Sequence, residues 1–354
     1  MAPNISTTET KILTEEDFQK NESLTTKIIN DENDTQYKRE VYVKDEKWFT
    51  MKLKWKNIIF ISLLHISFVY VCFTFKFFEN LKTLAWIFIM YLIGGIGVTG
   101  GAHRFWTHHA YKAKWPLRVI LVIMYSSSGL NNLYDWVRDH RVHHKYTDTD
   151  ADPHNSNRGF FFSHVGWLMV KKNSEVIRRG RETDMSDLLT DPIAIFYCKH
   201  YSIFRFVFAF LLPVMMPVYG WNETLYRALV SQIIIRYTLL LNIIWSVNSA
   251  AHIWGSKPYN GNINPTENWL IAFFGGGEGW HNYHHVFPWD YKAAELGSYM
   301  FNLTTMFIDF FAKIGWAYDL KQPSEKLVRN TAIKKGDGSH SLWNATSHSD
   351  NKIK

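Results

Sequence analysis

Cysteine is scarce in this chain, with only Cys72 and Cys198 among 354 residues. Neither belongs to a Cys-x-x-Cys pair, and two cysteines in or beside apolar segments cannot form a disulfide framework. A secretory signal is also lacking, because residues 1–50 are polar and hold no apolar segment near their start. We expect residues 1–45 to be a disordered polar tail, rich in Thr, Glu, Asn and Asp.

Negative charge is in shorter supply than positive charge. The 39 Lys and Arg outnumber the 32 Asp and Glu, which gives a net charge of +7. Seven of the basic residues lie between positions 38 and 56, just before a long apolar run. That position is typical of the cytoplasmic flank of a membrane span, and it favours a lipid bilayer over nucleic acid as the partner.

Long apolar runs are abundant, and 47% of the residues are hydrophobic. Four runs are close to the roughly 20 residues that cross a hydrocarbon core, and they lie at residues 57–75, 83–102, 203–219 and 225–247. The links within the first pair and within the second pair are short, so each pair predicts a helical hairpin. A further apolar stretch at 117–125 is too short to span and predicts a buried or interfacial helix.

These runs predict an all-α integral membrane protein with four transmembrane helices in two hairpins. Residues 46–325 would form the membrane domain, with both termini and the polar regions 103–201 and 248–325 on the cytosolic side. Residues 326–354 are expected to form a polar C-terminal tail. Arg236 falls inside the fourth run, where a charge is costly in lipid, so its side chain should face protein or reach the surface.

Histidine supplies the chemistry of the chain, with 16 copies. Residues 140–144 and 281–285 both read His-x-x-His-His, and this spacing directs three imidazoles from one face of a helix. His103 and His108 form a looser pair. They would point about 140° apart on a continuous α-helix, so we expect one metal to take both only if the helix breaks.

A ninth histidine, His252, follows the fourth apolar run and shares a helix face with Asn248, four residues earlier. Neutral imidazole suits iron, zinc, copper and nickel, and nine imidazoles are too many for one metal but suit two. The candidate metal ligands are His103, His108, His140, His143, His144, His252, His281, His284 and His285. The other histidines lack the triplet spacing and are expected to be structural or to support the ligands.

Several other kinds of metal protein fit the sequence poorly. A carboxylate-bridged di-iron bundle needs two Glu-x-x-His elements, and only residues 278–281 qualify. A membrane zinc hydrolase would need about three ligands and a water. A bis-histidine haem protein would place its ligands within opposing spans rather than at their cytosolic ends. A site with two metals at the cytosolic ends of the spans is the interpretation we favour.

The histidine segments resemble the three histidine boxes of the membrane-bound acyl-CoA desaturases, and most strongly those of insect Δ9 and Δ11 enzymes and of stearoyl-CoA desaturases. The first box reads His-Arg-Phe-Trp-Thr-His, and the other two carry the His-x-x-His-His spacing. The resemblance covers about residues 45–325. The segments that carry it are residues 103–108, 140–144, 152–154, 158–167, 248–252 and 281–285.

This resemblance implies a multi-pass enzyme of the endoplasmic reticulum membrane, with a di-iron centre held in a cytosolic helical cap. The enzyme would introduce a Δ9 or Δ11 double bond into a long-chain saturated acyl-CoA, for unsaturated fatty acid or pheromone-precursor biosynthesis. O2 would be the co-substrate, and electrons would come from NADH through cytochrome b5 reductase and cytochrome b5. All nine histidines would be ligands, and Asn248 would hold a metal-bound water.

The resemblance also implies contacts to both ends of the substrate. Arg138 and Asp139 would lie at the entrance for CoA, and Lys171 and Lys172 would meet its phosphates. The alternative for these two lysines is a plain solvated or membrane-facing surface.

For the acyl tail, Trp136 and Trp245 match walls of an apolar tunnel near the bend of the chain. The far end of the tunnel would lie around Tyr91 and Gly95. Gly95 and its neighbouring glycines are small, which predicts room for a longer acyl chain. The alternative is that these glycines only allow close helix packing.

Two other functions remain open at the level of sequence. A hydroxylase, acetylenase or conjugase of the same superfamily would share the histidine boxes. A non-enzymatic membrane metal-binding protein or transporter would need a polar path across the spans, where His65 and Arg236 are nearly alone. The position of the double bond also stays open, because it depends on small differences in how the chain is placed.

Overall fold

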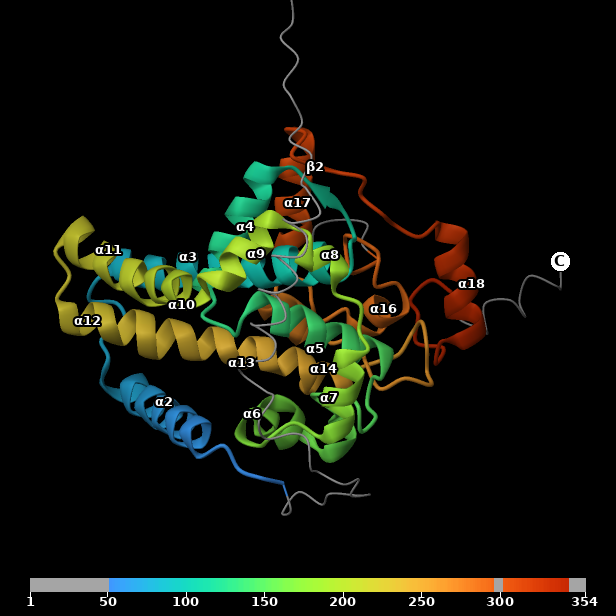
Figure 1. Cartoon of the computed structure of the whole chain (residues 1–354), viewed down its shortest axis with the longest axis horizontal. Helices are drawn as coiled ribbons and strands as arrows, with labels where there is room; N and C mark the ends of the chain where they lie inside the picture. The colour runs from blue at the N-terminus through green and yellow to red at the C-terminus, as the bar shows by residue number, and fades with distance from the viewer. Residues whose placement is uncertain (1–50, 296–301, 344–354) are drawn as a thin grey trace, which may run out of the picture. The chain divides into compact units, whose positions relative to one another are not determined.

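A computed structural model of the chain describes residues 51–295 and 302–343 (Figure 1). These residues are mostly helical, and β1 (Lys112–Ala113) pairs with β2 (Ala317–Tyr318) in a short antiparallel ladder. The expected disordered tail at 1–45 lies outside the described residues and stays a prediction.

Four helical segments in the described part of the chain are long and apolar enough to cross a membrane. They are Trp55–Thr74, Leu81–Thr107, Tyr201–Trp221 and Leu225–Ile253, which confirms the four predicted spans. The second and fourth have 27 and 29 residues. At about 1.5 Å per residue they are about 40 Å long, more than the roughly 30 Å hydrocarbon core. The extra turns carry His103 and His252 beyond the apolar part of each span.

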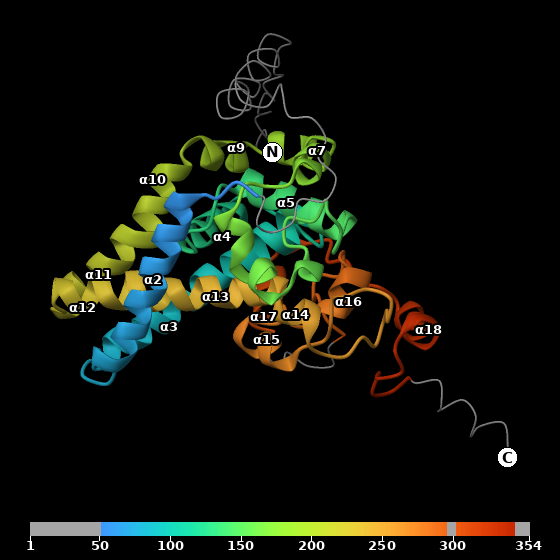
Figure 2. The same ribbon diagram turned by 90° about the horizontal axis from the view of Figure 1, so that it is seen from below.

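The first span is a single α-helix, whereas the other three combine α-helical segments with π-helical ones, whose hydrogen bonds link residues five apart. Figures 1 and 2 show α12 and α13 leading along the molecule towards α14, α5 and α16. In chain order, the segments are α2 (Trp55–Thr74), α3 (Leu81–Ile96), η2 (Gly97–Thr107), α10 (Tyr201–Arg205), η5 (Phe206–Leu211), α11 (Leu212–Trp221), α12 (Leu225–Leu229), η6 (Val230–Arg236), α13 (Tyr237–Asn248) and α14 (Ala250–Ile253).

The remaining helices surround the ends of the second and fourth spans. They are α4 (Trp115–Ser127), α5 (Leu133–Lys145), η3 (Ser156–Arg158), η4 (Phe162–Gly166), α6 (Trp167–Met169), α7 (Ser174–Arg181), α8 (Ser186–Leu189), α9 (Pro192–Lys199), α15 (Trp269–Phe274), α16 (His281–Val286), α17 (Leu303–Lys313) and α18 (Glu325–Lys335).

The two hairpin turns are joined to each other by polar contacts. Thr83 Oγ1 donates to Glu223 Oε2 at 2.6 Å, and Arg227 Nη1 lies 2.6 Å from Glu79 Oε2. Asn80 begins α3 by accepting from the backbone N–H groups of Lys82 and Thr83. Caps and pairs of this kind satisfy polar groups at helix ends. They fix one hairpin against the other.

Arg236 faces protein, as predicted for a charge inside a span. Its guanidinium is fully buried and donates to the carbonyl oxygens of Ser127 and Ala209 at 3.0 and 2.6 Å. Ser127 ends α4, the helix predicted from the short apolar stretch, and Leu117 and Leu121 of α4 are fully buried. The guanidinium therefore satisfies carbonyl groups that the helix end and the π-helical segment η5 leave unpaired.

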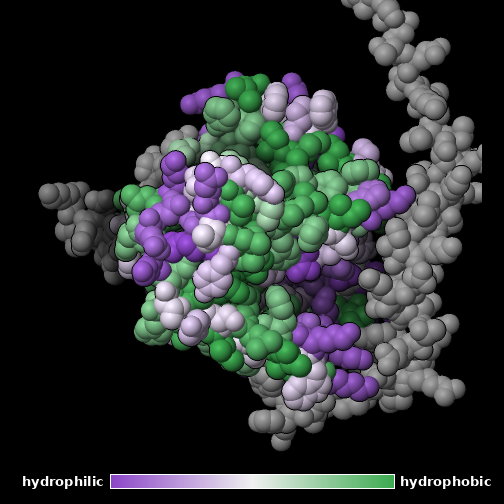
Figure 3. Space-filling model, turned by 90° about the vertical axis from the view of Figure 1, so that its left-hand side faces the viewer, coloured by the Kyte–Doolittle hydropathy of each residue, from purple (hydrophilic) through white to green (hydrophobic). Residues whose placement is uncertain are grey.

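Apolar side chains cover much of the outer surface of the spans. Phe73, Phe78 and Tyr219 are each more than 80% exposed. Hydrophobic residues make up much of the face shown in Figure 3, which looks onto the left-hand side of Figure 1. Exposed apolar surface of this extent is typical of contact with lipid.

Packing continues past residue 325, where we expected a polar tail to begin. Ser324 accepts from the backbone N–H of Leu327 and starts helix α18. Val328 and Ala332 of this helix are buried in a cluster with Tyr259, Tyr283 and Phe287. These two small anchors are too few to stand out in a polar sequence, which is why the helix was missed.

Candidate metal centre

The first pair of histidines is brought together by the π-helix η2. The backbone N–H of His108 donates to the carbonyl of His103 at 3.1 Å, a bond that spans five residues. Residues five apart therefore lie roughly above one another, and the two imidazole centroids are 4.9 Å apart. Our expectation that the helix must break was wrong, because the helix changes its hydrogen-bond period instead.

All nine predicted histidines meet in two groups. The nitrogen atoms in each group lie within 4.8 Å of one another. The groups adjoin, since the rings of His144 and His285 stack at 4.1 Å. The first group is His103, His108, His140, His144 and His284, and the second is His143, His252, His281 and His285.

Helix geometry explains why each triplet serves both groups. Relative to His140, His144 is rotated by about 40° and His143 by about −60°. The first and last histidines of a triplet therefore point towards one group, and the second histidine points towards the other group. The same rule assigns His281 and His285 to the second group and His284 to the first. The sequence spacing predicted a shared face but not this division.

Three buried carboxylates orient one histidine each. Glu278 Oε2 lies 2.8 Å from His103 Nδ1, Asp152 Oδ1 2.9 Å from His143 Nδ1, and Asp148 Oδ2 3.1 Å from His252 Nδ1. A carboxylate on Nδ1 fixes the tautomer and leaves Nε2 free to bind a metal. This role of Glu278 and Asp148 was not predicted from the sequence. The available signal is that each carboxylate lies within four residues of a histidine box.

These carboxylates remain ionised despite their burial. Burial alone would raise the pKa of Glu278, but the charges and hydrogen bonds of His103 and Arg104 outweigh it and hold the pKa at about 2. Burial likewise opposes ionisation of Asp148, and hydrogen bonds from His252 and Ser156 bring its pKa to about 2. Each is therefore a fixed negative charge behind a histidine at neutral pH.

The imidazole nitrogens converge closely within each group. His103 Nε2 and His284 Nε2 are 2.9 Å apart, and His281 Nε2 is 3.1 Å from His252 Nε2. Among the described residues, the buried Nε2 atoms of His108, His140 and His143 have no hydrogen-bond partner. Buried polar atoms without partners are costly, and a bound cation would satisfy these nitrogens.

Protonation also favours metal binding. Burial, followed by the charge of neighbouring imidazoles, lowers the pKa of His140, His144, His284 and His285 well below the ordinary value. These side chains are therefore neutral at physiological pH and present a lone pair. The residues thus fit a pair of imidazole-ligated transition metals.

Comparison with known proteins agrees with this geometry. The sequence profile described as Fatty acid desaturase matches residues 43–296. The chain is 48% identical to the Acyl-CoA Delta-9 desaturase of Acheta domesticus over 97% of this chain and 94% of that protein. It is 48% identical to the Acyl-CoA Delta(11) desaturase of Spodoptera littoralis, over 81% and 84% of the two chains. A third relative, the (11Z)-hexadec-11-enoyl-CoA conjugase of Bombyx mori, is 44% identical over 88% and 96%.

The chain belongs to the fatty acid desaturase family. It is therefore an oxidoreductase with the membrane fold of that family, and its two histidine groups could hold metal ions. A transporter that only carries metal is excluded by this assignment.

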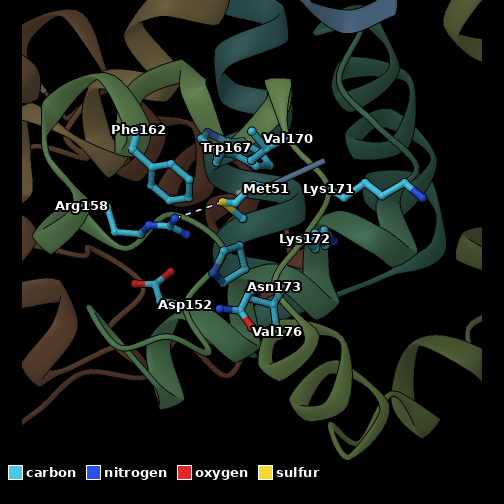
Figure 4. Close-up of a pocket in the computed structure, with 11 residues that line it drawn as sticks. Met51, Asp152, Arg158, Phe162, Trp167, Val170, Lys171, Lys172, Asn173 and Val176 are labelled. Atoms are coloured by element: carbon cyan, nitrogen blue, oxygen red, sulfur yellow. Dashed lines mark hydrogen bonds between the residues drawn. The ribbon is translucent and has the colours of Figure 1, made fainter. Parts of the chain in front are cut away.

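Basic residues gather beside the second box of the desaturase. Arg138 pairs with Asp135 at 2.9 Å, and Lys172 Nζ lies 2.5 Å from Asp139 Oδ2. Lys171 and Lys172 line a cleft with Arg158 and eight other residues, and in Figure 4 the Lys171 side chain extends away from the rest. Arg158 contacts the sulfur of Met51 there.

The positive charge of these lysines affects the protonation of the neighbouring Lys54. Burial, and then the positive charge of Lys172, lowers the pKa of Lys54. A cationic cluster at a surface cleft suits an anionic ligand. The structure thus brings the four predicted head-group residues of the desaturase into one neighbourhood.

The two predicted tunnel tryptophans lie against different parts of the site. Trp136 stacks on the ring of His140 at 4.8 Å, so it borders the first metal group directly. Trp245 is 3% exposed and packs with Ile61, Leu64 and Leu241 in the interior of the spans. Asn248, the predicted holder of a metal-bound water, is partly buried at the end of α13, four residues before His252.

The glycines near Tyr91 differ in what surrounds them. A Cβ on Gly97 would lie 2.1 Å from the Met124 backbone, and one on Gly94 2.8 Å from Leu240. Close helix packing explains these two glycines. A Cβ on Gly95 would meet only Leu240 Cδ1 at 4.0 Å among the described residues. Gly95 therefore borders open space, and the Tyr91 hydroxyl donates to the Phe274 carbonyl at 2.7 Å.

A salt bridge missed at the level of sequence ties the first box to the second. Arg141 lies inside the second box and contacts both carboxylate oxygens of Asp187, at 2.8 and 2.7 Å. Its Nη2 also donates to the carbonyl of Trp106, in the first box, at 2.8 Å. A bidentate pair of this kind gives orientation as well as energy, so Asp187 orients the Arg141 guanidinium, and the bond to Trp106 joins the second box to the first.

Proposed function

We propose that this protein is an acyl-CoA desaturase that uses two iron ions to introduce one double bond into a long-chain saturated acyl chain. The observation that carries this proposal is the pair of adjoining histidine groups with five and four imidazoles. Imidazole suits iron, and the names of the relatives supply the acyl-CoA substrate. The Δ9 or Δ11 position follows the same relatives.

The overall reaction defines what the residues must do. Two hydrogens leave neighbouring methylenes, and O2 takes them up with two further electrons and two protons to give two waters. Breaking an unactivated C–H bond needs an oxidant that side chains do not supply, and iron with O2 provides it. The nine histidines would hold the iron ions, and Asn248 would hold a water on one of them.

The protein's own part is to bind, orient and exclude water. Lys171, Lys172 and Arg138, with Asp139, would receive the CoA end at the surface. Trp136 and Trp245 would form the walls beside the reacting methylenes, and the open space at Gly95 would take the methyl end of the chain. Fixing reactants in this way removes much of the entropic part of the barrier.

We also propose an endoplasmic reticulum location, with the metal groups and both chain termini on the cytosolic side. The basic run that ends at Lys56, at the start of the first span, supports this orientation. Electrons would come from NADH through cytochrome b5. A conjugase is the second candidate, because a relative with that name is 44% identical.

The test is expression in a yeast that lacks its own Δ9 desaturase, with double bonds located in its lipids by mass spectrometry. The unaltered chain should restore unsaturated lipid. His108→Ala should abolish the product, because it removes one imidazole of the first group. His109→Ala is the matched control, since this neighbouring histidine is about half exposed and belongs to neither group.

Two outcomes would contradict the proposal. One is no unsaturated lipid from the unaltered chain with iron bound and the electron carrier present. The other is equal product from His108→Ala and the unaltered chain. A conjugated diene as the main product would favour the second candidate.

A further inference from the structure

Three polar side chains from three elements meet beside Trp245, inside the spans. His65 lies in α2, Asn242 in α13 and His164 in η4. Asn242 Nδ2 is 3.1 Å from His65 Nε2, and Asn242 Oδ1 is 3.2 Å from His164 Nε2. The amide thus donates to one imidazole and accepts from the other. We call these three residues the bracket.

The outer ends of the bracket are also fixed. His65 Nδ1 donates to the Ile61 carbonyl at 2.8 Å, which leaves Nε2 as the acceptor for the amide. His164 Nδ1 is 2.9 Å from the Ser249 hydroxyl. The Ser249 hydroxyl donates to the Trp245 carbonyl at 3.0 Å, so it links the His164 ring to the backbone of the tryptophan. Neither ring can turn without breaking a hydrogen bond.

The bracket holds the indole of Trp245 from two directions. The His65 ring stacks on it with centroids 6.1 Å apart and planes 18° apart. The His164 ring meets it edge-on at 5.8 Å and 82°. Because the amide of Asn242 links the two rings, their positions around the indole depend on one another.

Trp245 is coupled to the metal groups through the helix that carries it. His252, in the second group, lies seven residues later in α14, which follows α13 after the single turn residue Ser249. Ser249 lies between them and is bonded to His164. The bracket is therefore bonded to the segment that joins Trp245 to the second histidine group.

A purely structural role is the alternative. Polar side chains in spans bond to one another to avoid lipid and can join helices. That role predicts lower stability when the bracket is broken, with unchanged products. A positioning role predicts changed products in a protein that still binds its metals.

We propose that the bracket fixes the orientation of the Trp245 indole and thereby selects which methylene pair of the acyl chain faces the metals. This inference rests on the proposed function, since only an enzyme that acts on an acyl chain has a double-bond position to set. His65, Asn242 and His164 are positioning residues that act through Trp245. A displacement of about 1 Å at a reacting centre changes rates by roughly a hundredfold.

The test uses variants that keep volume and remove hydrogen bonds. Asn242→Leu removes the amide's bonds to both imidazoles, together with the bond that Nδ2 donates to the Thr238 carbonyl at 2.8 Å. His65→Phe and His164→Phe keep a ring beside the indole and remove its nitrogens. Thr238→Val is the control, because this buried hydroxyl lies one turn earlier in α13 and has no hydrogen-bond partner among the described residues.

The full-length variants are expressed in the yeast described above and purified for iron analysis. We measure double-bond positions, iron per chain, and product formed per NADH consumed. Asn242→Leu should keep the iron content of the unaltered chain, raise the share of displaced double bonds several-fold, and lower the product per NADH. The two Phe variants should shift products in the same direction, and Thr238→Val should match the unaltered chain.

Unchanged double-bond positions and unchanged product per NADH in all three bracket variants would overturn the proposal and leave only a structural role. If Asn242→Leu fails to accumulate, His65→Phe decides, because it places an apolar ring in an apolar span. An unaltered chain that makes no unsaturated product would overturn the proposed function itself. A working unaltered chain with insensitive variants would overturn the bracket alone.

Discussion

Buried carboxylates determine which nitrogen of three histidines faces the metal groups. Among them, Glu278 contacts His103 on one oxygen and Arg104 on the other. Arg104 is itself 1% exposed and also donates to the Tyr291 carbonyl at 2.9 Å. Removing one member of a buried ion pair leaves the other charge uncompensated. The metal site and the surrounding interior therefore depend on the same carboxylate.

Glu278→Gln should weaken metal binding by roughly 10- to 100-fold, the range typical of lost partners behind metal ligands. The amide has no negative charge to offset Arg104. It can also present its NH2 group, in place of an oxygen, to His103 Nδ1. Iron retained per chain against increasing chelator measures the effect.

Glu267→Gln is the control for that experiment. Burial raises the pKa of Glu267 to about 8, although backbone hydrogen bonds from Tyr283 and Asn282 lower it in part. The side chain is therefore mostly protonated at neutral pH, and an amide is a close substitute. Equal loss of iron from both variants would show that the charge of Glu278 is unimportant.

At the scale of elements, the change from α-helical to π-helical hydrogen bonding in the second span determines where His103 and His108 lie. The positions of the spans could be predicted from sequence, because bilayer thickness sets the length of an apolar run. The π-helical segments could not, since composition does not reveal whether a backbone bond spans four residues or five. His103 and His108 consequently seemed to diverge, although η2 brings them together.

The site itself was predictable in its members but not in its arrangement. Nine histidines stand out by spacing alone, but their division into two groups depends on how α5 and α16 face each other. The carboxylates behind them come from distant turns, as Asp148 does for His252. Such partners are set by tertiary packing, which local sequence does not encode.

Gly95→Tyr should shift the products towards shorter acyl chains. A Cβ at Gly95 meets only Leu240 at 4.0 Å among the described residues, so a larger side chain enters open space rather than a helix contact. One methylene in an apolar pocket changes selectivity roughly 10-fold or more, so the C16 to C18 product ratio should rise by at least that factor. Gly95→Ala should show little change, and an unchanged ratio in Gly95→Tyr would place the end of the tunnel elsewhere.

At the scale of the whole molecule, apolar spans are joined to a polar region with excess positive charge. The net charge is +7, and α18 exposes Lys326, Arg329, Lys334 and Lys335. These cations lie on a different part of the chain from Lys171 and Lys172, the proposed contacts for CoA. Encounter with an acidic electron carrier and binding of an anionic substrate are thus separable by their response to salt.

Raising the ionic strength should slow turnover driven by cytochrome b5 more than it weakens acyl-CoA binding. Long-range attraction between exposed charges is screened within about 10 Å at 0.1 M salt, whereas contacts in a partly buried cleft are screened less. Turnover is measured from 0.05 to 0.5 M salt at saturating acyl-CoA, with a small uncharged reductant replacing the carrier as the control. Between those limits, carrier-driven turnover should fall roughly 10-fold, within the range for electrostatically steered association, and turnover with the reductant should fall much less. Equal falls in both would mean that salt acts on the enzyme or on acyl-CoA binding, and not on the encounter with the carrier.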